Sequence, residues 1–232
     1  MERAVLTTGA VAFFVIGYFA VGHNIDPTRA RDLATSLDAR IPFIARSVWV
    51  YLWVFPASLL PLFLVRCPRL FRRTIVAYGV VIAVSLIVFA TFPVTSIGLR
   101  ADRAALDVTR FSPWTVAVLY RLDPPYNLFP SLHLSIVSLA ALSAWKARRL
   151  YGAAAFLGVV LIGVSICTVK QHFVLDGLGG LALAVVVYAF VLRKYAPPPG
   201  TDPAYGWRGP AAYAALLAVV YAGFYAAFRA AW

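Results

Sequence analysis

The sequence predicts an all-α protein, an integral membrane bundle of helices. Of its 232 residues, 62% are hydrophobic and only 13% are charged, whereas soluble domains average about 45–50% and about 25%. A water-soluble globule has no place to hide so much apolar surface, and a disordered chain would be more polar. The apolar residues form continuous runs without alternation, which favours helices over a β-barrel.

Seven stretches are apolar enough to cross about 30 Å of hydrocarbon, for which a helix needs about 20 residues. They cover residues 4–22, 47–65, 74–92, 130–146, 150–169, 176–193 and 211–230. We expect a six-span catalytic domain over residues 1–196, a Pro/Gly-rich linker over 197–210 and one additional transmembrane helix over 211–232. The first stretch is longer than the core of a signal peptide, and we interpret it as an uncleaved anchor.

The basic residues predict the orientation of the chain. There are 21 Lys and Arg against 9 Asp and Glu, a formal net charge of +12. Dense basic clusters lie in the short connections at residues 66–73, 146–149 and 193–194, and such loops stay on the cytoplasmic side. We therefore expect a multi-pass protein of a bacterial inner membrane, with a cytoplasmic N-terminus and the opposite face toward the periplasm or exterior. A nucleic-acid partner is not expected, since no polar domain carries a basic patch.

Two longer connections, residues 23–46 and 93–129, then lie outside. Four apolar residues of the first recur at helical spacing: Leu33, Leu37, Ile41 and Ile44. This pattern predicts an amphipathic helix on the membrane surface, with a lid over a substrate as the alternative.

Two polar clusters lie at the ends of predicted spans, where burying ionisable residues is costly. One covers residues 126–133 and opens the fourth stretch, and the other covers residues 165–176, between the fifth and the sixth. From His133 the chain crosses the bilayer inward and back before it reaches His172. Because two crossings restore the side, we expect both histidines at the outer face, where they can share one site.

His172 and Asp176 are four residues apart and share one face of a helix. The carboxylate can accept the proton-bearing ring nitrogen of His172, which leaves the other nitrogen free to attack phosphorus. Lys170 adjoins the pair and can neutralise phosphate oxygens. A zinc site of two histidines and an aspartate is the competing interpretation, but a metal cation beside Lys170 would be repelled.

The first cluster also suits an anion. Pro130 favours the first turn of a helix, whose free N–H groups and positive dipole end would face the outer side. Ser131 can donate a hydrogen bond to phosphate or can cap the helix, and His133 can protonate a leaving oxygen. We expect Asn127 and Tyr126 to position the substrate. No cofactor and no metal are expected, because phosphoryl transfer needs mainly positioning and neutralisation of charge.

These residues resemble the type 2 phosphatidic acid phosphatase superfamily of membrane lipid phosphatases and phosphotransferases. That family carries the signatures K-x6-R-P, P-S-G-H and S-R-x5-H-x3-D. Residues 130–133 match the second signature except for Leu132. The third is matched at Ser165, His172 and Asp176, with Ile166 in place of the arginine. This variant pattern resembles the branch that includes inositol phosphorylceramide synthases.

The resemblance implies a role for each matching residue. His172 would be the nucleophile that forms a phosphohistidine, Asp176 would orient it, and His133 would be the general acid. Ser131 and the adjoining backbone would bind phosphate. The first signature is absent, because no lysine precedes Lys146. The candidates to replace it are the loop arginines Arg100, Arg103, Arg110 and Arg121, and we favour Arg121 together with Lys170.

The resemblance therefore implies a membrane lipid phosphatase that hydrolyses a lipid phosphate or pyrophosphate without a metal. One alternative is a phosphotransferase that moves a phospho-headgroup to a lipid or sugar hydroxyl. A second alternative is a non-catalytic membrane carrier or lipid-binding protein, which the missing first signature and Ile166 favour. The expected partner is a lipid phosphate within the membrane, and the oligomeric state is left open.

Overall fold

The computed structural model describes residues 1–198 and 200–231. The expected linker and last span include Pro199 and Trp232, which lie outside the described residues. Within the described part, the regular structure is helical and strand pairing is limited to isolated bridges. This confirms the predicted fold class.

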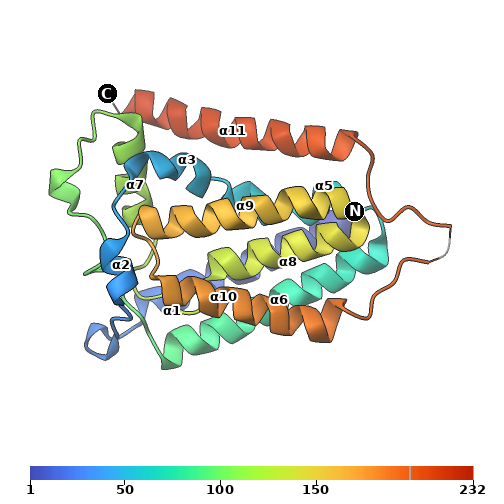
Figure 1. Cartoon of the computed structure of the whole chain (residues 1–232), viewed down its shortest axis with the longest axis horizontal. Coiled ribbons are helices and arrows are strands. Elements are labelled where there is room, and N and C mark those ends of the chain that lie inside the picture. Colours follow the sequence, from blue (N-terminus) through green and yellow to red (C-terminus); the bar gives the residue numbers. More distant parts are fainter. Residues whose placement is uncertain (199, 232) are drawn as a thin grey trace.

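Among the described residues, five helices are long and apolar enough to cross a membrane. They are α1 (Glu2–His23), α6 (Pro68–Thr91), α9 (Arg149–Thr168), α10 with its π-helical end (Val174–Leu192) and α11 (Arg208–Ala230). A shorter apolar helix, α8 (Leu132–Ala147), runs beside them. The helices lie along the long axis of the molecule, so that α1 begins at one end and α11 finishes at the other (Figure 1).

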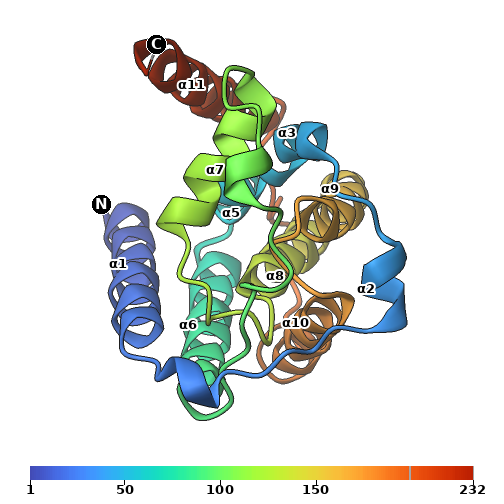
Figure 2. The same cartoon turned by 90° about the vertical axis from the view of Figure 1, so that its left-hand side faces the viewer.

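The central helix is α8, which lies among α6, α9 and α10 when the bundle is viewed end-on (Figure 2). Most of its residues are buried, and many of them are small. Small side chains let helix backbones approach closely, which is how helices associate inside a membrane. The start of α8 and α10 approach closely at Gly180, where an added Cβ would lie 2.4 Å from the carbonyl oxygen of Ser131. The two polar clusters are thereby fixed against each other.

The prediction of one continuous span over residues 47–65 was wrong. This stretch forms three short helices, α3 (Val48–Tyr51), α4 (Val54–Ala57) and α5 (Leu60–Leu64). Pro56 and Pro61 have no backbone N–H to donate and interrupt the helical ladder. Hydropathy alone does not predict these two breaks, because both prolines lie within a continuous run of apolar residues.

The predicted surface helix of residues 23–46 was also largely wrong, since α2 covers only Ser36–Arg40. Thr35 and Asp38 form a capping box that starts this helix, and Pro42 disfavours helical structure in the residue before it. A further helix, α7 (Phe111–Leu122), lies in the second outer connection. It was not predicted, because a search for stretches of membrane-spanning length passes over a 12-residue helix.

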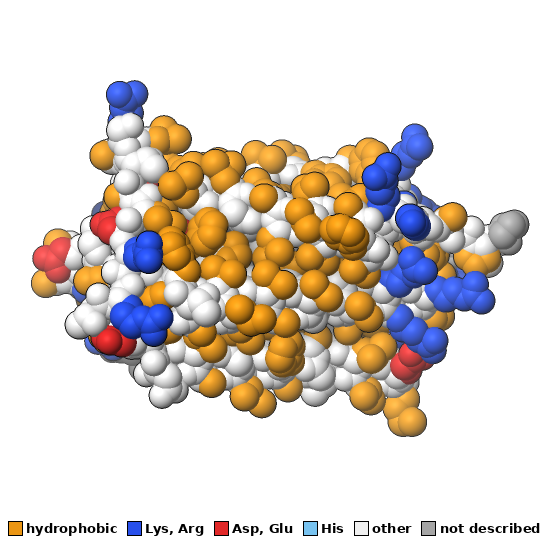
Figure 3. Space-filling view, turned by 90° about the horizontal axis from the view of Figure 1, so that it is seen from below, with side chains coloured by type: hydrophobic (Ala, Val, Ile, Leu, Met, Phe, Trp, Pro, Cys, Tyr) orange, Lys and Arg blue, Asp and Glu red, His pale blue; other side chains and the backbone are white. Residues whose placement is uncertain are grey.

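The surface has an apolar belt between two charged ends. Figure 3 shows hydrophobic side chains over the middle of the molecule, a dense group of Lys and Arg at one end, and mixed charges at the other. Such a belt is the surface that lipid tails cover in a multi-pass membrane protein.

Candidate active site

His133 and His172 are in direct contact at the end of the bundle with mixed charges. Nδ1 of His133 lies 2.9 Å from Nε2 of His172, although 39 positions separate the two residues. The helices α8 and α9 make this possible, because the chain leaves the site along one and returns along the other. The prediction that the two histidines share one end of the molecule is confirmed.

Asp176 lies behind His172 and is fully buried. Its Oδ2 is 3.4 Å from Nδ1 of His172 and accepts the backbone N–H of Phe173 at 2.9 Å. His172 itself precedes α10, so the two residues do not share a continuous helix as the spacing suggested. A tight turn holds the imidazole instead, because the N–H groups of Gln171 and His172 both donate to the carbonyl of Ile166.

Ser131 is the N-cap of α8 and is buried. Its hydroxyl oxygen accepts the N–H of Leu134 at 3.4 Å, which is the capping alternative that the sequence left open. Its backbone N–H donates to the carbonyl of Asp176 at 2.9 Å. Ser131 therefore joins the two polar clusters through the backbone, and its phosphate-binding role stays a prediction.

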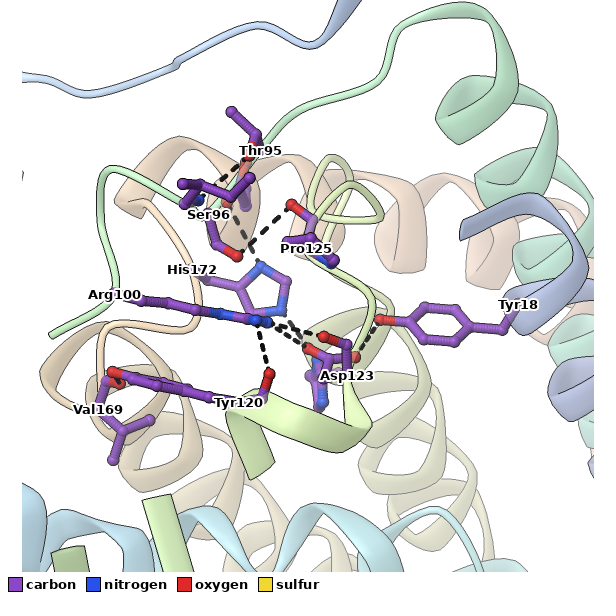
Figure 4. Close-up of polar contacts among 12 residues, drawn as sticks. Tyr18, Thr95, Ser96, Arg100, Tyr120, Asp123, Pro125, Val169 and His172 are labelled. Carbon is purple, nitrogen blue, oxygen red and sulfur yellow. Dashed lines mark hydrogen bonds and ion pairs between the residues drawn. The ribbon is translucent and has the colours of Figure 1, made fainter. Parts of the chain in front are cut away.

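Arg100 is the loop arginine that the structure brings into the buried site. Its guanidinium donates to the carbonyls of Tyr120 (3.0 Å) and Asp123 (3.1 Å), and its side chain is only 12% exposed. Figure 4 shows it bonded to Tyr120 and Asp123, in the same view as His172. Its Nε is buried without a hydrogen-bond partner among the described residues. The Nε donor of the guanidinium is thus unused within the described residues.

Asp123 connects this arginine to α1. Tyr18 donates its hydroxyl to Oδ1 of Asp123 at 2.5 Å, and Arg100 lies 3.5 Å from Oδ2. Burial raises the pKa of Asp123, while the Tyr18 hydroxyl and the Arg100 charge oppose that shift. The carboxylate therefore holds Arg100 in place rather than leaving it to solvent.

The other loop arginines lie elsewhere. Arg103, Arg110 and Arg121 are exposed, and Arg110 pairs with Asp107. Of the four arginines that the sequence offered, the structure therefore favours Arg100 over Arg121 as the cation next to the histidines.

Lys170 binds the outer connection instead of pointing at the histidines. Its Nζ donates to the carbonyls of Asp38 (3.0 Å) and Ile41 (2.5 Å), and its backbone takes a left-handed conformation with φ of 56°. Asp38 in turn accepts the N–H of Val174 at the start of α10. Burial opposes the charge of Asp38, but the hydrogen bonds that its carboxylate accepts from Val174 and Thr35 prevail and lower its pKa. A phosphate-binding role for Lys170 stays a prediction.

Asn127 and Tyr126 precede α8. Asn127 is buried and donates its Nδ2 to the carbonyl of Tyr18 at 2.8 Å, so it fastens the loop to α1. Its Oδ1 has no hydrogen-bond partner within residues 1–198 and 200–231. Tyr126 is half-buried. Their roles in positioning a substrate stay predictions.

The sequence analysis missed Tyr51. Its hydroxyl lies 2.9 Å from Nε2 of His133, and the residue is almost fully buried on α3. The sequence carries no signal for it, because Tyr51 stands in an apolar run far from both polar clusters.

An apolar cavity of about 520 Å³ adjoins the site. Tyr51, Asp123 and His133 line one end, and Thr7 and Phe71 line the other. Thr7 and Tyr18 both line the cavity from α1, and eleven residues of helix span about 16 Å. The cavity therefore leads from His133 deep into the apolar belt.

Comparison with known protein families gives one match. The model of the PAP2 superfamily matches residues 29–190, more than half of the chain. The matched range includes α8, α9 and every candidate site residue, whereas α1 and α11 lie outside it. Comparisons with curated proteins and with solved structures find no match.

Proposed function

The chain belongs to the PAP2 superfamily, and we propose that it hydrolyses a lipid phosphate or pyrophosphate through a phosphohistidine on His172. Membership of that superfamily indicates an enzyme of the phosphatase or phosphotransferase type. The observation that carries the proposal is the row formed by His133, His172 and Asp176, in which each residue lies within hydrogen-bond distance of the next.

In the first step His172 attacks phosphorus. The Asp176 carboxylate accepts a hydrogen bond from the protonated Nδ1 of His172, so that the lone pair of the imidazole is on Nε2. As the Nε2–P bond forms, the bond from phosphorus to the leaving oxygen breaks. A protonated His133 gives its Nδ1 proton to that oxygen and becomes neutral.

In the second step water resolves the phosphoenzyme. Nδ1 of the neutral His133 takes a proton from water, and the hydroxide oxygen bonds to phosphorus. The Nε2–P bond breaks, its electron pair returns to His172, and inorganic phosphate leaves. His133 ends this step protonated, ready for the next substrate. The rings must separate to admit a phosphate, since 2.9 Å between them leaves no room for one.

Arg100 supplies the positive charge in this proposal. Phosphoryl transfer spreads negative charge over the equatorial oxygens, so a fixed cation lowers its barrier. The free Nε of Arg100 and its low exposure support this role. A guanidinium in a buried site acts more strongly than one in water, because the local dielectric is lower.

The cavity supports a lipid as the substrate. Its length of about 16 Å along α1 is close to half of a hydrocarbon core of about 30 Å. Val11, Val15 and Phe55 line it and are also exposed at the surface, so it opens sideways toward the bilayer. A lipid tail can lie there while its phosphate reaches His133.

The charge distribution supports a site that faces the exterior. The dense basic clusters lie at the end of the bundle away from the histidines (Figure 3), and basic loops remain in the cytoplasm. The proposal therefore places the N-terminus inside and the two histidines at the outer face.

The test is phosphate release by the purified full chain from a panel of lipid phosphates, with and without alcohol acceptors. We expect free phosphate, also in the presence of a chelator, and a loss of several orders of magnitude in kcat for His172→Ala. His23→Ala is the matched control, because His23 is exposed and, among the described residues, its side chain is hydrogen-bonded to Phe19 of its own helix alone.

Three outcomes would overturn the proposal in different ways. Unchanged turnover in His172→Ala would contradict the nucleophile, and loss of activity in chelator would indicate a metal enzyme. A new phosphate monoester of the alcohol, formed at the expense of free phosphate, would identify a transferase.

A further inference from the structure

The hydroxyl of Tyr51 touches the ring nitrogen of His133 that faces away from His172. Its distance to Nε2 is 2.9 Å, equal to the distance from Nδ1 of His133 to His172. Both nitrogens of His133 are therefore engaged, one toward the proposed nucleophile and one toward α3. Since Tyr51 is only 2% exposed, water does not compete strongly for this contact.

The direction of each hydrogen bond in this row of contacts follows from Asp176, the residue at its far end. Asp176 is ionised in the proposed function and only accepts, so Nδ1 of His172 carries a proton and Nε2 offers a lone pair. That lone pair needs a donor, which makes Nδ1 of a neutral His133 the protonated nitrogen. Nε2 of His133 is then an acceptor, and Tyr51 must donate to it. One carboxylate thus fixes the direction of three successive hydrogen bonds.

Gln171 offers Tyr51 a second partner in another state of His133. Its side chain lies near Tyr51 but forms no hydrogen bond with it, and the residue is 1% exposed. Neither its Nε2 nor its Oε1 has a hydrogen-bond partner within the described part of the chain. Buried polar atoms without partners are rare and need a physical reason. A reason would be that Oε1 of Gln171 accepts a hydrogen bond from Tyr51 only when Nε2 of His133 carries a proton.

We propose that Tyr51 is a positioning residue for the general acid, and that Gln171 acts with it. The inference rests on the proposed function. In the resting enzyme, where neutral His133 carries its proton on Nδ1, Tyr51 donates to its Nε2. When His133 is charged, its Nε2–H donates to Tyr51, whose hydroxyl turns its proton to Oε1 of Gln171. His133 takes up its extra proton from solvent together with the anionic substrate.

The arrangement makes Nδ1 the working nitrogen in both halves of the reaction. During turnover the proton on Nε2 stays in place, held by the Tyr51 oxygen. Only the Nδ1 proton moves, first to the leaving oxygen and then back from water. Without the hydroxyl, Nε2 becomes a buried group without a partner, and the ring is free to adopt the other tautomer or to turn.

Tyr51→Phe removes the hydroxyl and little else. We expect kcat to fall by about 10- to 100-fold, a part of the 10²–10⁴ that general acid–base catalysis contributes, with KM changed less than about twofold. Tyr195→Phe is the matched control, because Tyr195 is also buried, but it does not line the cavity and donates to Sγ of Cys67. We expect wild-type kcat for that variant.

Gln171→Leu tests the second partner. We expect a smaller loss in kcat than for Tyr51→Phe, and a double variant that resembles Tyr51→Phe alone. Such non-additivity is the mark of residues that act through each other. Losses that multiply in the double variant would overturn the role given to Gln171.

The closing experiment is ¹⁵N NMR of the full chain with labelled histidine, which reports the tautomer of each ring. His23→Ala and His133→Asn assign the signals of the three histidines. Neutral His133 is expected with its proton on Nδ1 in the wild type and in Tyr195→Phe, and with a large Nε2–H population in Tyr51→Phe. An unchanged tautomer in Tyr51→Phe would overturn the inference. If the wild type releases no phosphate from any lipid phosphate, the proposed function fails, while the tautomer still decides the role of Tyr51.

Discussion

In the proposed function, Nε2 of His172 keeps its lone pair because the Asp176 carboxylate engages Nδ1. Asp176 is held for this task by the N–H of Phe173, and Ser131 is bonded to the backbone of Asp176. Spacing in the sequence was enough to predict that His172 pairs with Asp176 and meets His133, although a tight turn before α10, and not a continuous helix, places His172 beside the carboxylate.

The identity of the cation was not predictable in the same way. Four arginines lie in the second outer connection, and the fold of that loop decides which one turns inward. Arg100 does so because the carbonyls of Tyr120 and Asp123 receive its guanidinium. Tyr51 escaped prediction for a related reason, because its partner lies 82 positions further along the chain.

Arg100→Ala should lower kcat/KM by about 100-fold or more, the range for loss of one preorganised donor at a developing charge. Arg100→Lys should recover little of the lost kcat/KM, since an ammonium does not reproduce the guanidinium fork that binds two carbonyls. Steady-state kinetics on a lipid phosphate measures both. The matched control is Arg103→Ala, at an exposed position of the same loop. Equal losses in Arg100→Ala and Arg103→Ala would mean that the loop arginines act only as surface charge.

At the scale of helices, close packing of α8 and α10 aligns the two halves of the site. The long helices could be predicted from apolar runs, because length and hydropathy decide whether a segment can span. The breaks at Pro56 and Pro61 and the helix α7 depend on backbone hydrogen bonding and on packing against α11. Hydropathy does not contain that information.

Gly180→Ala should separate these helices. An added Cβ would lie 2.4 Å from the carbonyl oxygen of Ser131, and overpacking of this kind costs about 1–3 kcal/mol. We expect a lower thermal midpoint in detergent and lower kcat, because Ser131 and Asp176 would shift together. Gly158→Ala is the control, since nothing lies within 4 Å of an added Cβ there. Equal thermal midpoints for the two variants would contradict the close contact.

The outer connection 23–46 is fastened to the site by Asp38. Because hydrogen bonds lower its pKa in the folded protein, its contribution to stability is present above the unfolded value of about 3.9. This contribution to stability is lost as the pH falls from the unfolded-state pKa through the lower pKa of the folded protein. Asp38→Asn should therefore reduce stability at pH 7. Between pH 5 and pH 3 the variant should lose less stability than the wild type does. Thermal unfolding at both pH values measures this. The control is Asp32→Asn, at an exposed position of the same connection.

For the whole molecule, the apolar belt and the basic end predict how the chain sits in a membrane. Composition alone predicted the class, because 62% hydrophobic residues leave no soluble alternative. The odd number of crossings predicted opposite ends for the two termini, and the broken stretch 47–65 still runs along the bundle (Figure 1).

Labelling of introduced cysteines tests the orientation. In a chain with Cys67 and Cys167 replaced by serine, Ala104→Cys should react with a membrane-impermeant maleimide in intact cells. Arg69→Cys should react only after the membrane is opened. Both positions are exposed, so accessibility is matched. The reverse pattern would place the histidines at the cytoplasmic face.

Trapping of the phosphoenzyme tests the nucleophile most directly. The full chain is mixed with a lipid phosphate labelled at phosphorus, quenched in alkali within one turnover, and digested for mass spectrometry. We expect an acid-labile phosphate on His172, formed in the wild type and in His23→Ala and lost in His172→Ala. Steady phosphate release with no label on His172, or with the label on another residue, would contradict covalent catalysis by this histidine.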